Sequence, residues 1–212
     1  MVSNLLYQFP SWLQHLYGNV VWRGDVAKRV VYLTFDDGPV EEVTPAVLDI
    51  LGHYGVKGTF FCVGENIARH PQLFARILAE GHAVGNHTYN HLAGWQTPTD
   101  VYLDNVEKAQ RQMAKAGVQT HLFRPPYGRM RFSQKRAVAD KYSIVMWDVL
   151  THDYNLNYTP EKILRIVQRY TRNGSIINFH DSLKSADNML GALPDCIEWL
   201  QKNGFEMSLL NF

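Results

Sequence analysis

Residues 33–39 read LTFDDGP, so the apolar run that begins at Val30 ends in two adjacent carboxylates and a Gly-Pro pair. Successive side chains of a strand point to opposite faces, so Asp36 and Asp37 should diverge. Pro39 has no N–H to give to a ladder, so the strand should stop at the acids and free the second one to turn. We therefore predict a buried strand that delivers two carboxylates with separate roles at its carboxyl end.

Short apolar runs alternate with helical patterns along the rest of the chain. After 30–35, strands are expected at 58–63, 83–87, 121–125, 143–148, 175–180 and 205–210. Between them, apolar residues recur at three- and four-residue spacing, and Thr44-Pro45 and Thr159-Pro160 place a capping hydroxyl before a first-turn proline. This alternation implies parallel strands with right-handed crossovers.

Polar motifs follow the carboxyl ends of several predicted strands, as in TIM-type barrels. The sequence therefore predicts an α/β protein with one domain, a distorted (β/α)7 TIM-like barrel over 30–212. Residues 1–29 are expected to form an extension, with a short helix, packed on that domain.

The composition restricts the class of protein. The 212 residues are 46% hydrophobic and 19% charged, with a formal net charge of +1 and no basic cluster. This argues against nucleic acid or a membrane surface as the main partner. The composition does not predict the oligomeric state. The N-terminus resembles neither a signal peptide nor a membrane span, so the chain as written is expected to be cytoplasmic. It would be extracytoplasmic if a leader had been removed. Cys62 and Cys196 are too few for a disulfide framework.

The stretch GNHTYNH, residues 85–91, contains a candidate metal site. His87 and His91 are four residues apart, a spacing that places two imidazoles on one face of a helical turn. With one carboxylate from Asp36 or Asp37 they would form a three-ligand site with open positions for water and substrate. Either aspartate could supply that ligand.

Three later motifs add polar groups at strand ends. In FRPPYG, residues 123–128, two prolines fix an irregular loop, and Arg124 could pair with a carboxylate. His180 ends SIINFHD and is a general-acid candidate because imidazole titrates near neutral pH. Asp148 or Asp153 could orient it, and the sequence does not choose between them.

Together, TFDDGP, HTYNH, RPPYG, WDVLTHDY and FHD resemble, in order and spacing, the motifs of NodB-like polysaccharide deacetylases, carbohydrate esterase family 4. The resemblance covers residues 30 to about 210. It implies a metal-dependent hydrolase that removes N-acetyl groups from poly- or oligosaccharides containing N-acetylglucosamine. It also implies one divalent cation, with Zn²⁺ expected first and Co²⁺, Ni²⁺, Mn²⁺ or Fe²⁺ also compatible with the ligands.

The resemblance assigns roles to the first two motifs. It implies that Asp36 is the general base and that Asp37, His87 and His91 are the metal ligands.

The other motifs supply the remaining groups that the resemblance implies. Arg124 would pair with the base, His180 would be the general acid and Asp153 would orient it. The Tyr127 N–H would face the developing oxyanion. Other residues expected at the substrate are Tyr154, Pro125 and Trp95.

Two positions depart from the family pattern. Tyr154 stands where the family usually has Trp, and Asn178 stands where an aliphatic residue usually lines the pocket for the acetyl methyl group. The second departure questions either the alignment of that pocket with the family pattern or a strictly apolar acyl site.

Three other functions are compatible with part of these motifs. The nearest is hydrolysis of another amide, such as a cyclic imide or ureide, on the same scaffold; the complete ligand set disfavours it. Two histidines and a carboxylate also suit an Fe(II) oxygenase, but that chemistry generally resides on an all-β fold. A non-catalytic carbohydrate-binding protein is disfavoured by the complete set of catalytic residues. The sequence does not name the glycan or the metal.

Overall fold

A computed structural model describes residues 7–10, 14 and 18–211. The strands are all parallel within their sheets. They are β1 (Val20–Val21), β2 (Val30–Asp36), β3 (Thr59–Cys62), β4 (Ala83–Asn86), β5 (Leu122–Phe123), β6 (Ser143–Val145), β7 (Val149–Leu150), β8 (Ile176–His180) and β9 (Glu206–Met207). The seven predicted strands are present, most of them shorter than expected, and β1 and β7 are additional.

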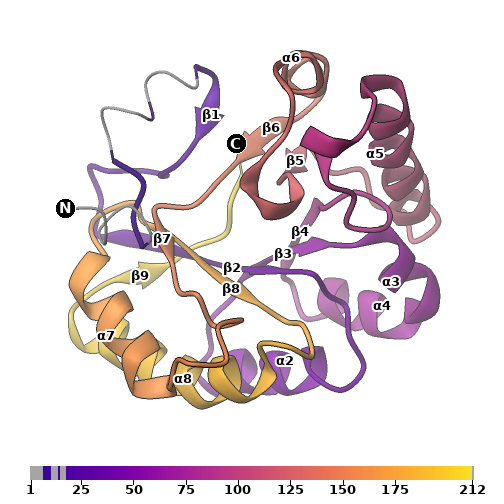
Figure 1. Cartoon of the computed structure of the whole chain (residues 1–212). Helices are drawn as coiled ribbons and strands as arrows, with labels where there is room; N and C mark the ends of the chain where they lie inside the picture. Colours follow the sequence, from indigo (N-terminus) through magenta and orange to yellow (C-terminus); the bar gives the residue numbers. More distant parts are fainter. Residues whose placement is uncertain (1–6, 11–13, 15–17, 212) are drawn as a thin grey trace.

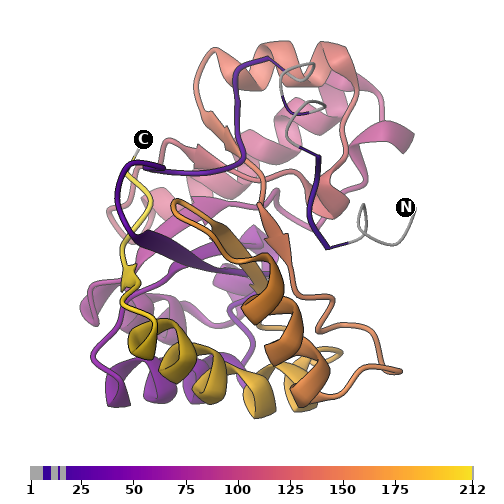
Figure 2. The same ribbon diagram turned by 90° about the vertical axis from the view of Figure 1, so that its left-hand side faces the viewer.

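Seven α-helices connect these strands in the described part of the chain. They are α2 (Thr44–His53), α3 (Gly64–Arg69), α4 (Pro71–Ala79), α5 (Thr99–Ala114), α6 (Phe132–Ala139), α7 (Pro160–Tyr170) and α8 (Ala186–Lys202), with short 3₁₀ turns η3 (Gly94–Gln96) and η4 (Pro126–Gly128). Figure 1 shows the helices arranged around the outside of the strands. In Figure 2 the orange helix α7 and the yellow helix α8 lie side by side below the strands.

The strand order is β1-β6-β5-β4-β3-β2-β8-β7, and β9 pairs with β2. Among the described residues no pairing joins β1 to β7, so the barrel is open between these two strands. This confirms the predicted (β/α)7-like barrel as a distorted, half-closed one in a single domain. None of the helices that the structure describes is long and apolar enough to cross a membrane.

Strand β2 runs through the centre of the core. All seven of its residues are buried, as expected for a parallel strand covered on both faces. Phe35 stacks between Phe60 of β3 and Phe179 of β8, with ring centroids 4.9 and 5.9 Å away. The strand is therefore fixed by packing up to its last residue, Asp36.

Only one of the two predicted capping hydroxyls caps a helix. The Thr159 side chain accepts a hydrogen bond from the Lys162 N–H at the start of α7. The prediction for Thr44 was wrong, because Thr44 is already the first residue of α2 and Val43 occupies the N-cap. The Thr44 hydroxyl instead donates to the buried carboxylate of Asp181, at 2.6 Å.

The domain boundary at residues 29 and 30 remains a prediction. Val20–Val21 pairs with β6, and the Phe9 ring stacks on Trp22 with centroids 4.5 Å apart. Most of the segment in which the N-terminal helix was expected lies outside the described residues.

Candidate active site

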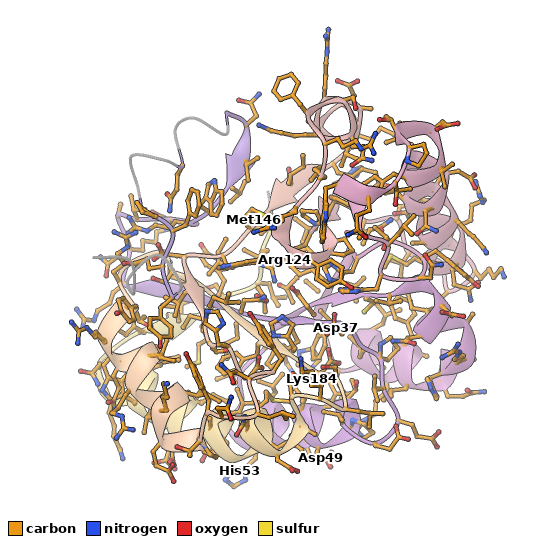
Figure 3. The ribbon with its side chains drawn as sticks, in the orientation of Figure 1. Asp37, Asp49, His53, Arg124, Met146 and Lys184 are labelled. Atoms are coloured by element: carbon orange, nitrogen blue, oxygen red, sulfur yellow. The ribbon has the colours of Figure 1, made fainter. Side chains whose placement is uncertain are left out.

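The carboxyl ends of several strands surround one cleft of about 580 Å³. Figure 3 shows Asp37 and Arg124 in the middle of the molecule, whereas Asp49 and His53 lie at its outer edge. The cleft is lined by Asp36, Asp37, His87, His91, Tyr127, Trp147, Leu150, Tyr154, His180, Ser182 and Lys184. Its size is typical of small-molecule sites.

The two neighbouring acids separate at the end of β2. Asp36 remains in the strand, opposite His180 of β8 and Phe61 of β3. Asp37 leaves it with φ of 86°, in the left-handed region. The turn therefore begins at Asp37 itself, directly before the Gly38-Pro39 pair, in agreement with the expected turn of the second acid.

A buried carboxylate holds the loop that follows Asp37. Asp181 accepts hydrogen bonds from the Gly38 N–H at 3.0 Å and from the Thr44 hydroxyl. A methyl group on Gly38 would overlap this carboxylate, so only glycine fits there. The Asn66 amide donates to the Asp37 carbonyl at 2.7 Å. These contacts fix the backbone on both sides of the Asp37 carboxylate.

Asp37, His87 and His91 form a candidate metal site. One ligand atom from each lies within 4.8 Å of the others. The Asp37 Oδ1 atom is 3.2 Å from His91 Nε2 and 3.8 Å from His87 Nε2. This oxygen is buried and accepts no hydrogen bond from any residue that the structure describes. An unsatisfied carboxylate oxygen facing two imidazoles is the donor set that a divalent cation requires.

The hydrogen bond of His87 prepares it as a ligand. Its Nδ1 lies 2.7 Å from the Arg124 carbonyl, so Nδ1 carries the proton and the Nε2 lone pair is available. Burial lowers the pKa of His87 to about 4, although the charge of Asp36 opposes that change. His87 is therefore neutral at physiological pH, the form that binds metal.

Several residues at the cleft have a left-handed backbone without being glycine. Asp37, Thr88, His91, Tyr127 and His152 have φ between 55° and 86°. Such conformations cost about 1–2 kcal/mol each for most residue types. Three of the five, Asp37, His91 and Tyr127, line the cleft, so the strain coincides with residues expected to hold the metal or face the oxyanion.

Arg124 is the charge partner of Asp36. Its side chain is fully buried, and Nη1 lies 2.7 Å from Asp36 Oδ1. Nε and Nη2 donate to the carbonyls of Val145 and Met146 at 3.1 and 2.8 Å. The guanidinium also lies 4.0 Å from the centre of the Phe61 ring. Held on all sides, Arg124 supplies the counter-charge that a buried carboxylate needs.

His180 is oriented by Asp153. Asp153, fully buried, accepts from the backbone N–H of His180 and lies 2.7 Å from its Nδ1. Burial alone would lower the pKa of His180, but the charge and hydrogen bond of Asp153, together with the charges of Asp37 and Asp36, raise this pKa to about 9. Asp148, the alternative left open by the sequence, pairs with Arg172 at 2.6 Å instead.

The cleft thus combines a three-donor candidate metal site, a carboxylate paired with an arginine and an imidazole paired with a carboxylate. Residues 23–147 match the family model described as polysaccharide deacetylase. The chain belongs to the polysaccharide deacetylase family.

Individual relatives can be aligned with most of this chain. It is 31% identical to a peptidoglycan-N-acetylglucosamine deacetylase of Bacillus cereus over 190 residues, 89% of either chain. It is 36% identical to a chitooligosaccharide deacetylase of Bradyrhizobium sp. over 206 residues, 87% of this chain and 90% of that one. The crystal structure of the peptidoglycan N-acetylglucosamine deacetylase Bc1960 superposes with a TM-score of 0.88 at 32% identity, covering 95% and 94% of the two chains.

The residues expected at the substrate divide between two hollows of this deacetylase. Tyr127 and Tyr154 line the cleft, and the Tyr154 ring meets that of His180 edge-on, with centroids 5.0 Å apart. Pro125 and Trp95 line a neighbouring groove. The Trp95 ring packs against Tyr127 with centroids 5.2 Å apart. Tyr127, 59% exposed, therefore lies between the cleft and the groove.

Several lining residues of the deacetylase cleft were not singled out from the sequence. Leu150 supplies apolar wall beside the acids, and Ser182 and Lys184 follow the FHD motif. Leu150 belongs to β7, a two-residue strand too short to leave a pattern. Lys184, placed near Asp37 in Figure 3, could have been found as the cation closest in sequence to His180.

Proposed function

We propose that this deacetylase removes N-acetyl groups from N-acetylglucosamine units of poly- or oligosaccharides, with a divalent cation held by Asp37, His87 and His91. The proposal rests on the three donor atoms that lie within 4.8 Å of one another on the wall of the cleft that also contains Asp36 and His180. Zn²⁺ is the first candidate because it accepts nitrogen and oxygen ligands with an open position.

Asp36 is the proposed base. A bound cation would acidify a water molecule and polarise the amide carbonyl of the substrate. Asp36 is adjacent in sequence to a proposed ligand and lines the same cleft, which supports it as the group that accepts the proton of the attacking water. Arg124 balances the negative charge of Asp36 before the reaction, and its burial keeps the pair rigid.

The Tyr127 N–H is the proposed donor to the oxyanion. In η4 the N–H groups of Gly128 and Arg129 donate to the carbonyls of Pro125 and Pro126. The Tyr127 N–H donates to no backbone carbonyl of the described residues, although Tyr127 lines the cleft. A preorganised donor of this kind is typically worth about 3–4 kcal/mol to the transition state.

His180 is the proposed acid that protonates the departing amine. With a pKa of about 9, it is an imidazolium at neutral pH and has a proton to give. Its Nδ1 is engaged by Asp153, so Nε2 is the nitrogen left to face the cleft.

The test is acetate release from N-acetylated chitooligosaccharides and from peptidoglycan fragments, with added Zn²⁺ and after chelation. We expect release that chelation abolishes. Asp36→Asn should keep the metal and lose turnover, whereas Asp37→Ala should lose the metal, measured by elemental analysis. Asp49→Asn, at an exposed carboxylate far from the cleft, is the matched control and should behave as the parent.

Two results would contradict the proposal. Near-parental turnover by Asp36→Asn would remove Asp36 as the base. Binding of the glycans by the parent without acetate release from any of them would favour a non-catalytic carbohydrate-binding protein.

A further inference from the structure

Asn178 belongs to the core of the site and not to its acyl-binding surface. It lies in β8 opposite Thr34 of β2, two residues before His180. Its side chain is 1% exposed and does not line the cleft. The apolar wall of the cleft comes from Leu150 and Trp147 instead. The polar residue at this position therefore does not make the acyl-binding surface polar, and it needs another explanation.

The carboxamide of Asn178 lies between the two charges of the Asp36–Arg124 pair. Its Nδ2 donates to Asp36 Oδ2 at 3.0 Å, and its Oδ1 accepts from Arg124 Nη1 at 2.6 Å. The Thr34 hydroxyl lies 3.1 Å from the same Oδ1. The amide thus presents its donor to the anion and its acceptor to the cation. A flipped amide would place like partners together at both ends, so the network allows one orientation.

Both oxygens of Asp36 are therefore held by side chains. Oδ1 lies 2.7 Å from Arg124, and Oδ2 accepts from Asn178. With one oxygen engaged, a carboxylate can still rotate about its Cβ–Cγ bond. With two engaged, one by Asn178 of β8 and the other by Arg124 directly after β5, its plane is fixed. In Figure 3 Arg124 lies beside Met146, whose carbonyl anchors the far side of the guanidinium.

We propose that Asn178 is a positioning residue that fixes the carboxylate plane of Asp36 and so sets the turnover rate without contributing to substrate binding. This inference rests on the proposed role of Asp36 as the base. Proton transfer depends steeply on the position of the accepting oxygen, and small displacements of a catalytic group lower rates strongly. An aliphatic residue at this position would leave Asp36 Oδ2 without its amide donor, and the carboxylate would be held from one side only.

The experiment compares three variants of the full chain in steady-state acetate release. Asn178→Leu removes both ends of the amide. Asn178→Asp is nearly isosteric and keeps an acceptor for Arg124, but it replaces the donor to Asp36 by a second acceptor. Thr34→Val is the matched control, because Thr34 contacts Arg124 Nη1 and Asn178 but not Asp36.

For Asn178→Leu we expect kcat to fall about tenfold, equivalent to about 1.4 kcal/mol, with KM within about twofold of the parent. Asn178→Asp should lose more than Asn178→Leu, although its volume is conserved. Thr34→Val should lose less than either. Metal content and melting temperature, measured for each variant, separate these effects from loss of the site or of the fold.

Four results would overturn the inference. They are a kcat of Asn178→Leu within about twofold of the parent, a loss confined to KM, a loss that follows metal content, and equal losses in Asn178→Leu and Thr34→Val. A melting temperature that falls in step with kcat would assign Asn178 a structural role and overturn it as well. If the parent releases no acetate, the proposed function fails first and this inference with it. If the parent is active and only the variant pattern is wrong, the failure belongs to Asn178 alone.

Discussion

Asp153→Asn tests the electrostatic control of His180. The pKa of His180 rises from 6.5 to about 9, which corresponds to about 3 kcal/mol in favour of the imidazolium. Asp153 is the strongest of the groups that raise it, so an uncharged partner should lower this pKa towards its ordinary 6.5, while the charges of Asp37 and Asp36 continue to raise it. The proposed acid must be protonated, so activity is lost as pH rises through its pKa. For a complete return to 6.5, the imidazolium fraction at pH 8 would fall roughly thirtyfold in the variant, and at pH 6 it would change little.

The assay is the pH profile of kcat/KM for acetate release, with parent and variant loaded with the same metal. The descending limb of the profile should lie about two pH units lower in Asp153→Asn. A loss of His180 orientation lowers the rate at every pH alike, so the position of the limb isolates the charge effect. The control is Asp148→Asn, at a buried carboxylate paired with Arg172, which should leave the limb where it is. A limb at the parental pH in Asp153→Asn would refute the assignment of His180 as the acid.

Three further variants test the support around the cleft. Gly38→Ala should destabilise the fold by about 1–3 kcal/mol in chemical denaturation, because its methyl group must displace the Asp181 carboxylate; unchanged stability would contradict that contact. Arg124→Met should cost about 3–5 kcal/mol, because it leaves Asp36 buried without its counter-charge; a loss below about 1 kcal/mol would show that the pair is not needed for folding. Trp95→Ala should raise KM for chitooligosaccharides about fivefold at unchanged melting temperature if the neighbouring groove binds sugar rings, and an unchanged KM would exclude that role.

Sequence patterns predicted the features that recur along the chain, namely the alternation of strands and helices. Alternating strands and helices predicted the parallel sheet, and the buried run before Asp36 appears as β2. The polar groups at strand ends come together because carboxyl ends of parallel strands meet at one edge. Asp36, Asp37, His87, His91 and His180 therefore line one cleft, as expected.

The sequence could not resolve features that depend on contacts between distant segments. Asp148 and Asp153 look alike in WDVLTHDYN, and only the position of Arg172 beside Asp148 distinguishes them. In the sequence, Asn178 is a polar exception in an apolar strand. Its hydrogen bonds with Thr34 and Arg124, which come from distant segments, explain the polar side chain. Thr44 resembled a helix cap because its competing partner, Asp181, lies 137 residues away along the chain.

The left-handed backbone at Asp37, His91 and Tyr127 has a consequence for the evolution of this enzyme. Glycine would relieve each of these conformations, so the residues proposed to bind metal and to line the site lie where the fold alone favours glycine. Selection for heat resistance alone would therefore erode the site. In a screen of random variants for thermal stability, we expect substitutions to glycine at these three positions among the survivors, with catalytic activity lost in those at Asp37 and His91.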